Sequence, residues 1–90
     1  MRGRFLEITY RNGKPVAAYL YLPRQPDDRS VRTKRLEPGL VIDLAENGQA
    51  IGIEITSPSV TTLAHLNLAL AEAKQTELRP DEAAPLLSVA

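Results

Sequence analysis

Two carboxylates on either side of a short turn are the residues of this chain whose types and spacing could do chemistry. Asp43 precedes the dipeptide Asn47-Gly48, and Glu54 follows it within the stretch GIEI. If the turn closes a hairpin with a two-residue loop, Asp43 lies opposite Gly52 and diagonally from Glu54. Diagonal neighbours in a sheet are about 7–8 Å apart, close enough for two carboxyl groups to act as an acid and base pair.

The same three positions, Asp43, Gly52 and Glu54, also have a structural interpretation, which we favour. No partner acid, base or nucleophile stands nearby in the sequence, and Gly52 can leave room for the Asp43 side chain or for a close-packed neighbour. With one histidine and no cysteine, the chain offers no thiolate metal site and no histidine-rich centre. We predict no catalytic residue, no metal and no cofactor, and we expect these carboxylates to pair with a basic strand.

The turn at Asn47-Gly48 must be held by two strands, LVIDL (40–44) and AIGIEI (50–55). A two-residue loop pairs Leu44 with Ile51 and places six aliphatic side chains on one face, opposite the carboxylates. These six residues are Leu40, Ile42, Leu44, Ile51, Ile53 and Ile55.

An earlier hairpin is predicted from FLEITY (5–10) and VAAYLYL (16–22), which flank Asn12-Gly13. Asn-Gly between such runs is a strong hairpin signal because both loop residues must accept positive φ. A two-residue loop pairs Thr9 with Val16. In that register both faces of the hairpin are largely apolar, so other elements must cover them.

A basic segment, VRTKRL (31–36), suits an edge strand, where charge discourages pairing with other chains. Residues 1–39 hold nine Arg and Lys against four Asp and Glu, a balance of +5, while residues 40–90 hold two against seven, a balance of −5. The two halves can neutralise each other within one fold or across two copies. A neutral chain of this kind is not typical of a general nucleic-acid binder, so we expect no nucleic-acid partner.

A helix is predicted from Val60 to about Gln75, with Ser59 as its N-cap. At about 100° per residue, its leucines group on the side expected to face the aliphatic side chains of the sheet. These leucines are Leu63, Leu66 and Leu70. Leu68 widens the apolar arc, so the helix is expected to touch a second surface, and His65 is expected to face solvent.

The pattern as a whole predicts an α+β domain in residues 1–76. It contains a mainly antiparallel sheet of four or five strands, made of two hairpins and a basic edge strand, packed by one C-terminal helix. Residues 77–90 are predicted to form a C-terminal tail or a short extra turn. Its apolar residues Leu86, Leu87 and Val89 are expected to dock on this subunit or to reach a neighbour.

The stretch VIDLAENGQAIGIEITSPS (41–59) resembles the signature of a small prokaryotic family, the domain of unknown function 2283. The matching positions are Asp43, Gly48, Gly52, Ile53, Glu54 and Ile55. ITY…AAYLYL (8–22) is similar to the first hairpin of that family, so the resemblance covers about residues 5–60. In the first turn, where many members have acidic residues, this chain has RNGKP (11–15). The family has no established activity, so the resemblance implies a fold and not a reaction.

A 90-residue chain buries a modest core, and oligomerisation is a common remedy. No apolar stretch is long enough to span a membrane and no signal-type apolar core follows the N-terminus, so we expect a cytoplasmic protein. We predict a non-catalytic, self-associating interaction module that forms a homodimer. The alternatives are an antitoxin-like partner of a small neighbouring toxin, and a small-ligand binder or enzyme using Asp43 and Glu54. The candidate interface residues are Phe5, Leu20, Leu22, Leu68, Leu86 and Leu87.

Overall fold

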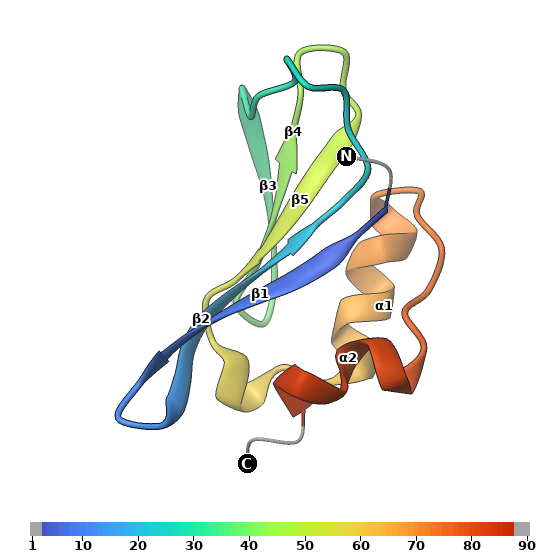
Figure 1. The fold of residues 1–90 in the computed structure, drawn as a ribbon. Helices are drawn as coiled ribbons and strands as arrows, with labels where there is room; N and C mark the ends of the chain where they lie inside the picture. Colours follow the sequence, from blue (N-terminus) through green and yellow to red (C-terminus); the bar gives the residue numbers. More distant parts are fainter. Residues whose placement is uncertain (1–2, 88–90) are drawn as a thin grey trace.

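Within the described residues, five antiparallel strands form one sheet and two helices follow it in the chain (Figure 1). The computed structural model describes residues 3–87, without the side chain of Leu87. The strands are β1 (Phe5–Arg11), β2 (Lys14–Tyr21), β3 (Arg32–Leu36), β4 (Leu40–Leu44) and β5 (Ala50–Ile55). A 3₁₀ turn (Pro58–Val60) leads to α1 (Leu63–Glu72) and α2 (Pro80–Leu87). The predicted α+β fold is confirmed, with a second helix in addition to the predicted one.

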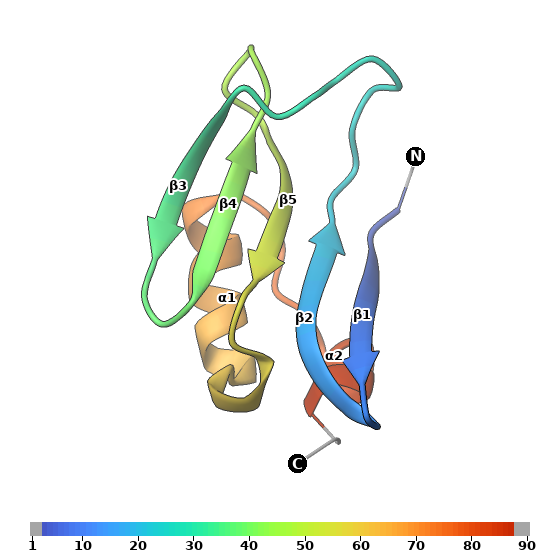
Figure 2. The same ribbon diagram turned by 90° about the vertical axis from the view of Figure 1, so that its left-hand side faces the viewer.

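The strand order across the sheet is β1-β2-β5-β4-β3, so the two hairpins join where β2 meets β5. Seen face-on, the sheet has both helices behind it and nothing of the described chain packed on its front (Figure 2). The hydrophobic core lies between the sheet and the helices. We call the uncovered side of the sheet the open face.

A bulge changes the predicted register of the first hairpin. Arg11 pairs with Lys14 as predicted, and Asn12 and Gly13 have φ of 53° and 76°. The pairing then shifts, so that Thr9 pairs with Ala17 and not with Val16. The extra residue returns the apolar side chains of both strands to one face, towards the core, and removes the predicted second apolar face. These core-facing residues are Leu6, Ile8, Ala18, Leu20 and Leu22.

The second hairpin keeps the predicted pairs of Asp43 with Gly52 and of Ile42 with Ile53. Nearer the turn, however, Leu44 pairs with Ala50 and not with Ile51. The reason is the turn itself, where Gly48 has φ of 86° and Asn47 stays outside the positive region, so the loop is not the predicted two-residue type. Ile51 is buried but does not belong to the cluster under the helices, whereas the other five predicted aliphatic residues do or pack against it.

The basic strand β3 is an edge strand, as predicted, and β4 is its only partner in the part of the chain that the structure describes. The charges of the two chain halves meet within one fold. Lys34 of β3 lies 2.6 Å from Glu72 of α1, and Arg4 lies 3.5 Å from Glu82 of α2. The sequence left open whether the two oppositely charged halves neutralise each other within one copy or across two. These ion pairs show that they do so within one copy.

Helix α1 begins three residues later than predicted, because Thr62 and not Ser59 is its N-cap. The backbone N–H of His65 donates to Thr62 Oγ1 at 3.1 Å, and the N–H of Thr62 donates to His65 Nδ1 at 3.2 Å. This reciprocal pair satisfies two free amides of the first turn, so His65 is a capping residue and not a solvent-facing spectator. Leu66 and Leu70 are fully buried in the core, as predicted for the sheet-facing side.

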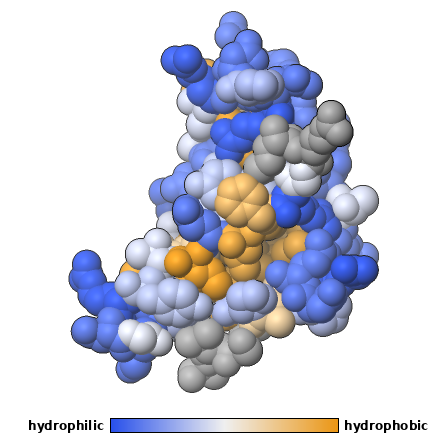
Figure 3. Space-filling view, in the orientation of Figure 1, coloured by the Kyte–Doolittle hydropathy of each residue, from blue (hydrophilic) through white to orange (hydrophobic). Residues whose placement is uncertain are grey.

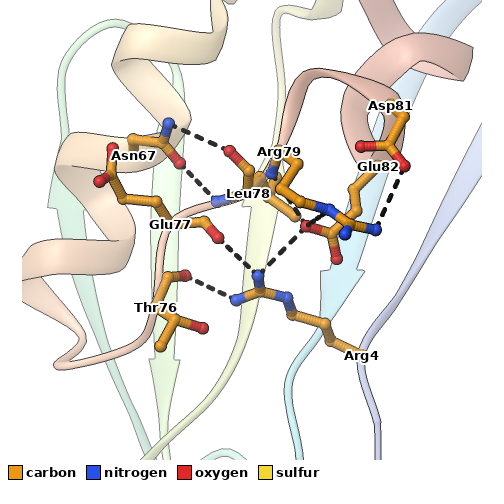
Figure 4. Close-up of polar contacts among 8 residues, drawn as sticks. All are labelled: Arg4, Asn67, Thr76, Glu77, Leu78, Arg79, Asp81 and Glu82. Atoms are coloured by element: carbon orange, nitrogen blue, oxygen red, sulfur yellow. Dashed lines mark hydrogen bonds and ion pairs between the residues drawn. The ribbon is translucent and has the colours of Figure 1, made fainter.

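Helix α2 occupies the segment predicted as a tail or short turn, and a polar network holds the chain that leads into it (Figure 4). The guanidinium of Arg4 donates to two carbonyl oxygens of this connection, those of Thr76 and Glu77, at 2.6 and 2.7 Å. The Asn67 side chain of α1 bonds both the N–H and the C=O of Leu78, at 2.8 and 3.4 Å. Ala83 and Leu86 then reach the core. Neither described helix is long and apolar enough to cross a membrane.

Candidate functional site

Asp43 of β4 accepts a hydrogen bond from a tyrosine two strands away on the open face. The Tyr19 hydroxyl of β2 donates to Asp43 Oδ2 at 2.7 Å. Between them lies Gly52 of β5, where an added Cβ would collide with the Tyr19 ring and hydroxyl. Glycine at this position is therefore required by the close approach of the tyrosine. The carboxylate of Asp43 is almost fully buried, with 7% of the residue exposed.

Glu54 completes the cluster, since it is the direct cross-strand partner of Tyr19 and the neighbour of Asp43. Its carboxyl group shares a hydrogen bond with that of Asp43, which raises the pKa of Glu54, and burial and the Asp43 charge act in the same direction. The positive charge of Arg35 opposes this shift. A neighbouring negative charge disfavours the ionised form of a carboxyl group, so ionised Glu54 is less stable beside Asp43 than it would be alone.

The chemistry of this cluster favours a structural role. Burial raises the pKa of Tyr19 far above its ordinary value, and the hydrogen bond to Asp43 adds to the shift. The phenol thus stays protonated as a donor and is a poor base near neutral pH. Within residues 3–87 no group of three His, Cys, Asp or Glu side chains is placed to hold a metal ion. The arrangement of Tyr19, Asp43, Gly52 and Glu54, which we call the clasp, links β2 to β4 across β5.

The structure brings Asp43, Gly52 and Glu54 together as the sequence predicts, but with a different main partner. We expected ion pairs with the basic strand. Of the residues of that strand, only Arg35 affects the pKa of Glu54, which its positive charge lowers. Tyr19, which donates to Asp43, was not among the candidate site residues. It lies in the first hairpin, and only the pairing of β2 with β5 brings it over Gly52.

A second group on the open face consists of aromatic and charged side chains beside the clasp. Phe5 of β1 stacks on Tyr21 of β2 with ring centroids 4.4 Å apart, and Tyr19 meets the edge of Tyr21 at 4.7 Å. The Tyr21 hydroxyl donates to Glu7 at 3.1 Å, and the Arg24 guanidinium lies 5.7 Å from the centre of the Tyr21 ring. Aromatic surface therefore runs from the middle of the open face to its β1 edge.

The six candidate interface residues fall into different environments. Three of them are buried in the core of this one chain: Leu20, Leu22 and Leu86. The bulge in β2 turns the first two towards the core, and the formation of α2 brings Leu86 there. Phe5 is about half exposed, and Leu68 is 68% exposed beside a groove of about 480 Å³ between α1 and the β3–β4 hairpin. The side chain of Leu87 and the whole of Val89 lie outside the described residues.

Together, the sheet and the clasp define a small α+β domain with a five-stranded antiparallel sheet covered on one face by helices. The family model described as "Protein of unknown function (DUF2283)" matches residues 17–58, which run from β2 to the 3₁₀ turn. The predicted resemblance to this family is confirmed, over a shorter stretch than expected. The match contains all four residues of the clasp: Tyr19, Asp43, Gly52 and Glu54. No curated protein and no solved structure matches the chain.

Proposed function

We propose that this protein is a non-catalytic interaction module that associates with a second copy of itself along the β1 side of its sheet. The observation that carries the proposal is the free outer edge of β1. This seven-residue strand has β2 on one side and no strand of the described chain on the other. An unpaired strand edge presents a row of N–H and C=O groups that another chain can pair with.

Exposed apolar side chains lie near both ends of the same edge strand. Phe5 and Tyr10 of β1 are 51% and 49% exposed, and the bulge residue Val16 of the neighbouring strand is 43% exposed. The opposite edge differs, since β3 carries Arg32, Lys34 and Arg35. Like charges at that edge oppose pairing with an identical strand, so the two edges of the sheet are not equivalent for self-association.

The carboxylate cluster supports this choice over an enzyme. Asp43 is bonded to Tyr19, and no buried side-chain polar atom of the described residues lacks a hydrogen-bond partner. A site built to bind a small polar ligand usually presents convergent polar groups in a concave pocket. Here such groups bond one another on a sheet surface.

Sedimentation equilibrium at micromolar concentration tests the proposal. We expect a homodimer of the 9.9 kDa chain that buries at least about 1,000 Å² in total, the usual threshold for a specific interface. Twofold dimers are the commonest closed assembly of small proteins. A folded monomer would contradict the proposal and would favour the antitoxin-like alternative, in which a different small protein covers this edge.

A further inference from the structure

We infer that the two copies join β1 to β1 in antiparallel fashion, forming one continuous sheet in which Glu7 of each copy pairs with Arg11 of the other. This inference rests on the proposed self-association and specifies its geometry. It makes the partner of β1 a second β1, and the assembled sheet twice the five strands of one chain.

The faces of the sheet are consistent with this geometry. Side chains alternate along β1, and the extra residue of the bulge lies in β2, so Glu7 and Arg11 both point to the open face. A twofold axis perpendicular to the sheet relates two antiparallel edge strands and keeps the open faces of both copies on the same side. Glu7 of one copy and Arg11 of the other therefore meet on one surface, and the helices of both copies stay on the other.

Charge restricts the register of the two strands. If the twofold axis passes beside Thr9, Glu7 stands directly opposite the second copy's Arg11. If the axis passes beside Ile8, Glu7 and the second copy's Arg11 are diagonal neighbours. Both positions are within reach of an ion pair. Centred on Glu7, the two glutamates oppose each other, which is destabilising. Within its own chain Arg11 faces Lys14, so the nearest cross-strand charge offers it no partner.

The surface along β1 also suits a second copy. Viewed towards this edge, apolar side chains gather in the middle of the molecule, over β1 and between β1 and the helices (Figure 3). Leu6 and Ile8 are only partly buried there, although they pack against the core. Edge pairing centred on Ile8 places the two Ile8 side chains opposite each other and Leu6 opposite Tyr10 of the other copy, which extends the apolar surface from one copy to the next.

Charge reversal tests the pairing. In Glu7→Arg or Arg11→Glu each of the two symmetric contacts becomes a like-charge contact, and we expect the dimer dissociation constant to rise by about tenfold or more, since exposed pairs contribute up to about 1 kcal/mol each. The double variant Glu7→Arg/Arg11→Glu restores opposite charges and should return to within about threefold of the unmodified chain. An equal mixture of the two single variants should form a heterodimer, because one copy is basic and the other acidic at the joint.

Glu46→Arg and Arg29→Glu are matched controls, since both residues are exposed and lie outside β1. Circular dichroism and thermal melting check that each variant folds. Glu7→Arg loses the contact with the Tyr21 hydroxyl, which could prevent folding. Arg11→Glu instead gains an attractive contact with Lys14, so we expect it to fold in either case. The dissociation constant of Arg11→Glu alone then decides the result.

The possible outcomes separate this inference from the proposed function. If the unmodified chain is a dimer that the single reversals leave unchanged, the β1 pairing is wrong while self-association stands. If single reversals weaken the dimer and neither the double variant nor the mixture restores it, the contact between Glu7 and Arg11 is wrong. A folded monomer of the unmodified chain overturns both.

Discussion

The hydroxyl of Tyr19 donates a 2.7 Å hydrogen bond to Asp43 across an intervening strand, over the glycine at position 52. The contact joins residues 24 positions apart, one from each hairpin. It spans the boundary between β2 and β5, which within residues 3–87 is the only place where the two hairpins pair. Its removal should therefore weaken the joint between the two halves of the sheet.

Tyr19→Phe is expected to lower the free energy of unfolding by about 1.5–3 kcal/mol, because it leaves a nearly buried carboxylate without its donor. Tyr21→Phe is the matched control. Its hydroxyl bonds Glu7 at an exposed position, so its loss should cost no more than about 0.5 kcal/mol. Urea denaturation of the two variants compares them directly, and equal losses would show that the bond to Asp43 carries no special weight.

Gly52→Ala is expected to destabilise the protein by at least about 2 kcal/mol, because the new methyl group displaces the Tyr19 ring and breaks its hydrogen bond. The same substitution made in a Tyr19→Ala background should cost less than about 0.5 kcal/mol, since the colliding ring is gone. A double-mutant cycle by chemical denaturation measures the difference. Additive effects would mean that Gly52 is needed for another reason.

Glu54→Gln is expected to stabilise the protein at pH 7. The pKa of Glu54 is raised in the folded state, chiefly through its contact with the Asp43 carboxyl, so the folded state holds this proton more tightly than the unfolded state. The favourable contribution is complete below the ordinary value of 4.5 and is lost as pH rises through the raised pKa. Glutamine resembles the protonated form, so its advantage should shrink as pH falls towards 4.

Thermal melting of this variant between pH 4 and pH 8 provides the measurement, with Glu46→Gln in the exposed turn as control. Added salt should reduce the gain, because part of it comes from charge repulsion at Glu54, which is partly exposed. A variant less stable than the unmodified chain at pH 7 would show that attraction to Arg35 outweighs repulsion from Asp43.

Leu70→Ala is expected to destabilise the protein by about 2–5 kcal/mol, since it leaves a cavity in the fully buried side of α1. Leu68→Ala removes the same atoms from the exposed side of the same helix and should change stability by less than about 0.5 kcal/mol. Denaturation midpoints of the pair report the orientation of α1. A comparable loss in both variants would mean that Leu68 is covered, for example by a partner.

Local features of the chain were predictable from the sequence because their causes are local. Asn12-Gly13 closes the first hairpin since both residues tolerate positive φ, and the three cations of β3 mark an edge strand. Strict alternation then placed Asp43, Gly52 and Glu54 on one face of β4 and β5, where the structure has them. The family resemblance followed from the same stretch.

The remaining features depend on contacts between distant segments, which no local pattern encodes. The bulge at Val16 lets the apolar residues of both strands of the first hairpin reach one core, and this global gain outweighs the regular pairing of a two-residue turn. Helix α2 forms where Leu78, Ala83 and Leu86 find the core that the sheet and α1 leave uncovered. Tyr19 becomes part of the clasp only because β5 separates β2 from β4, an order set by burial of the whole sheet and not by either hairpin alone.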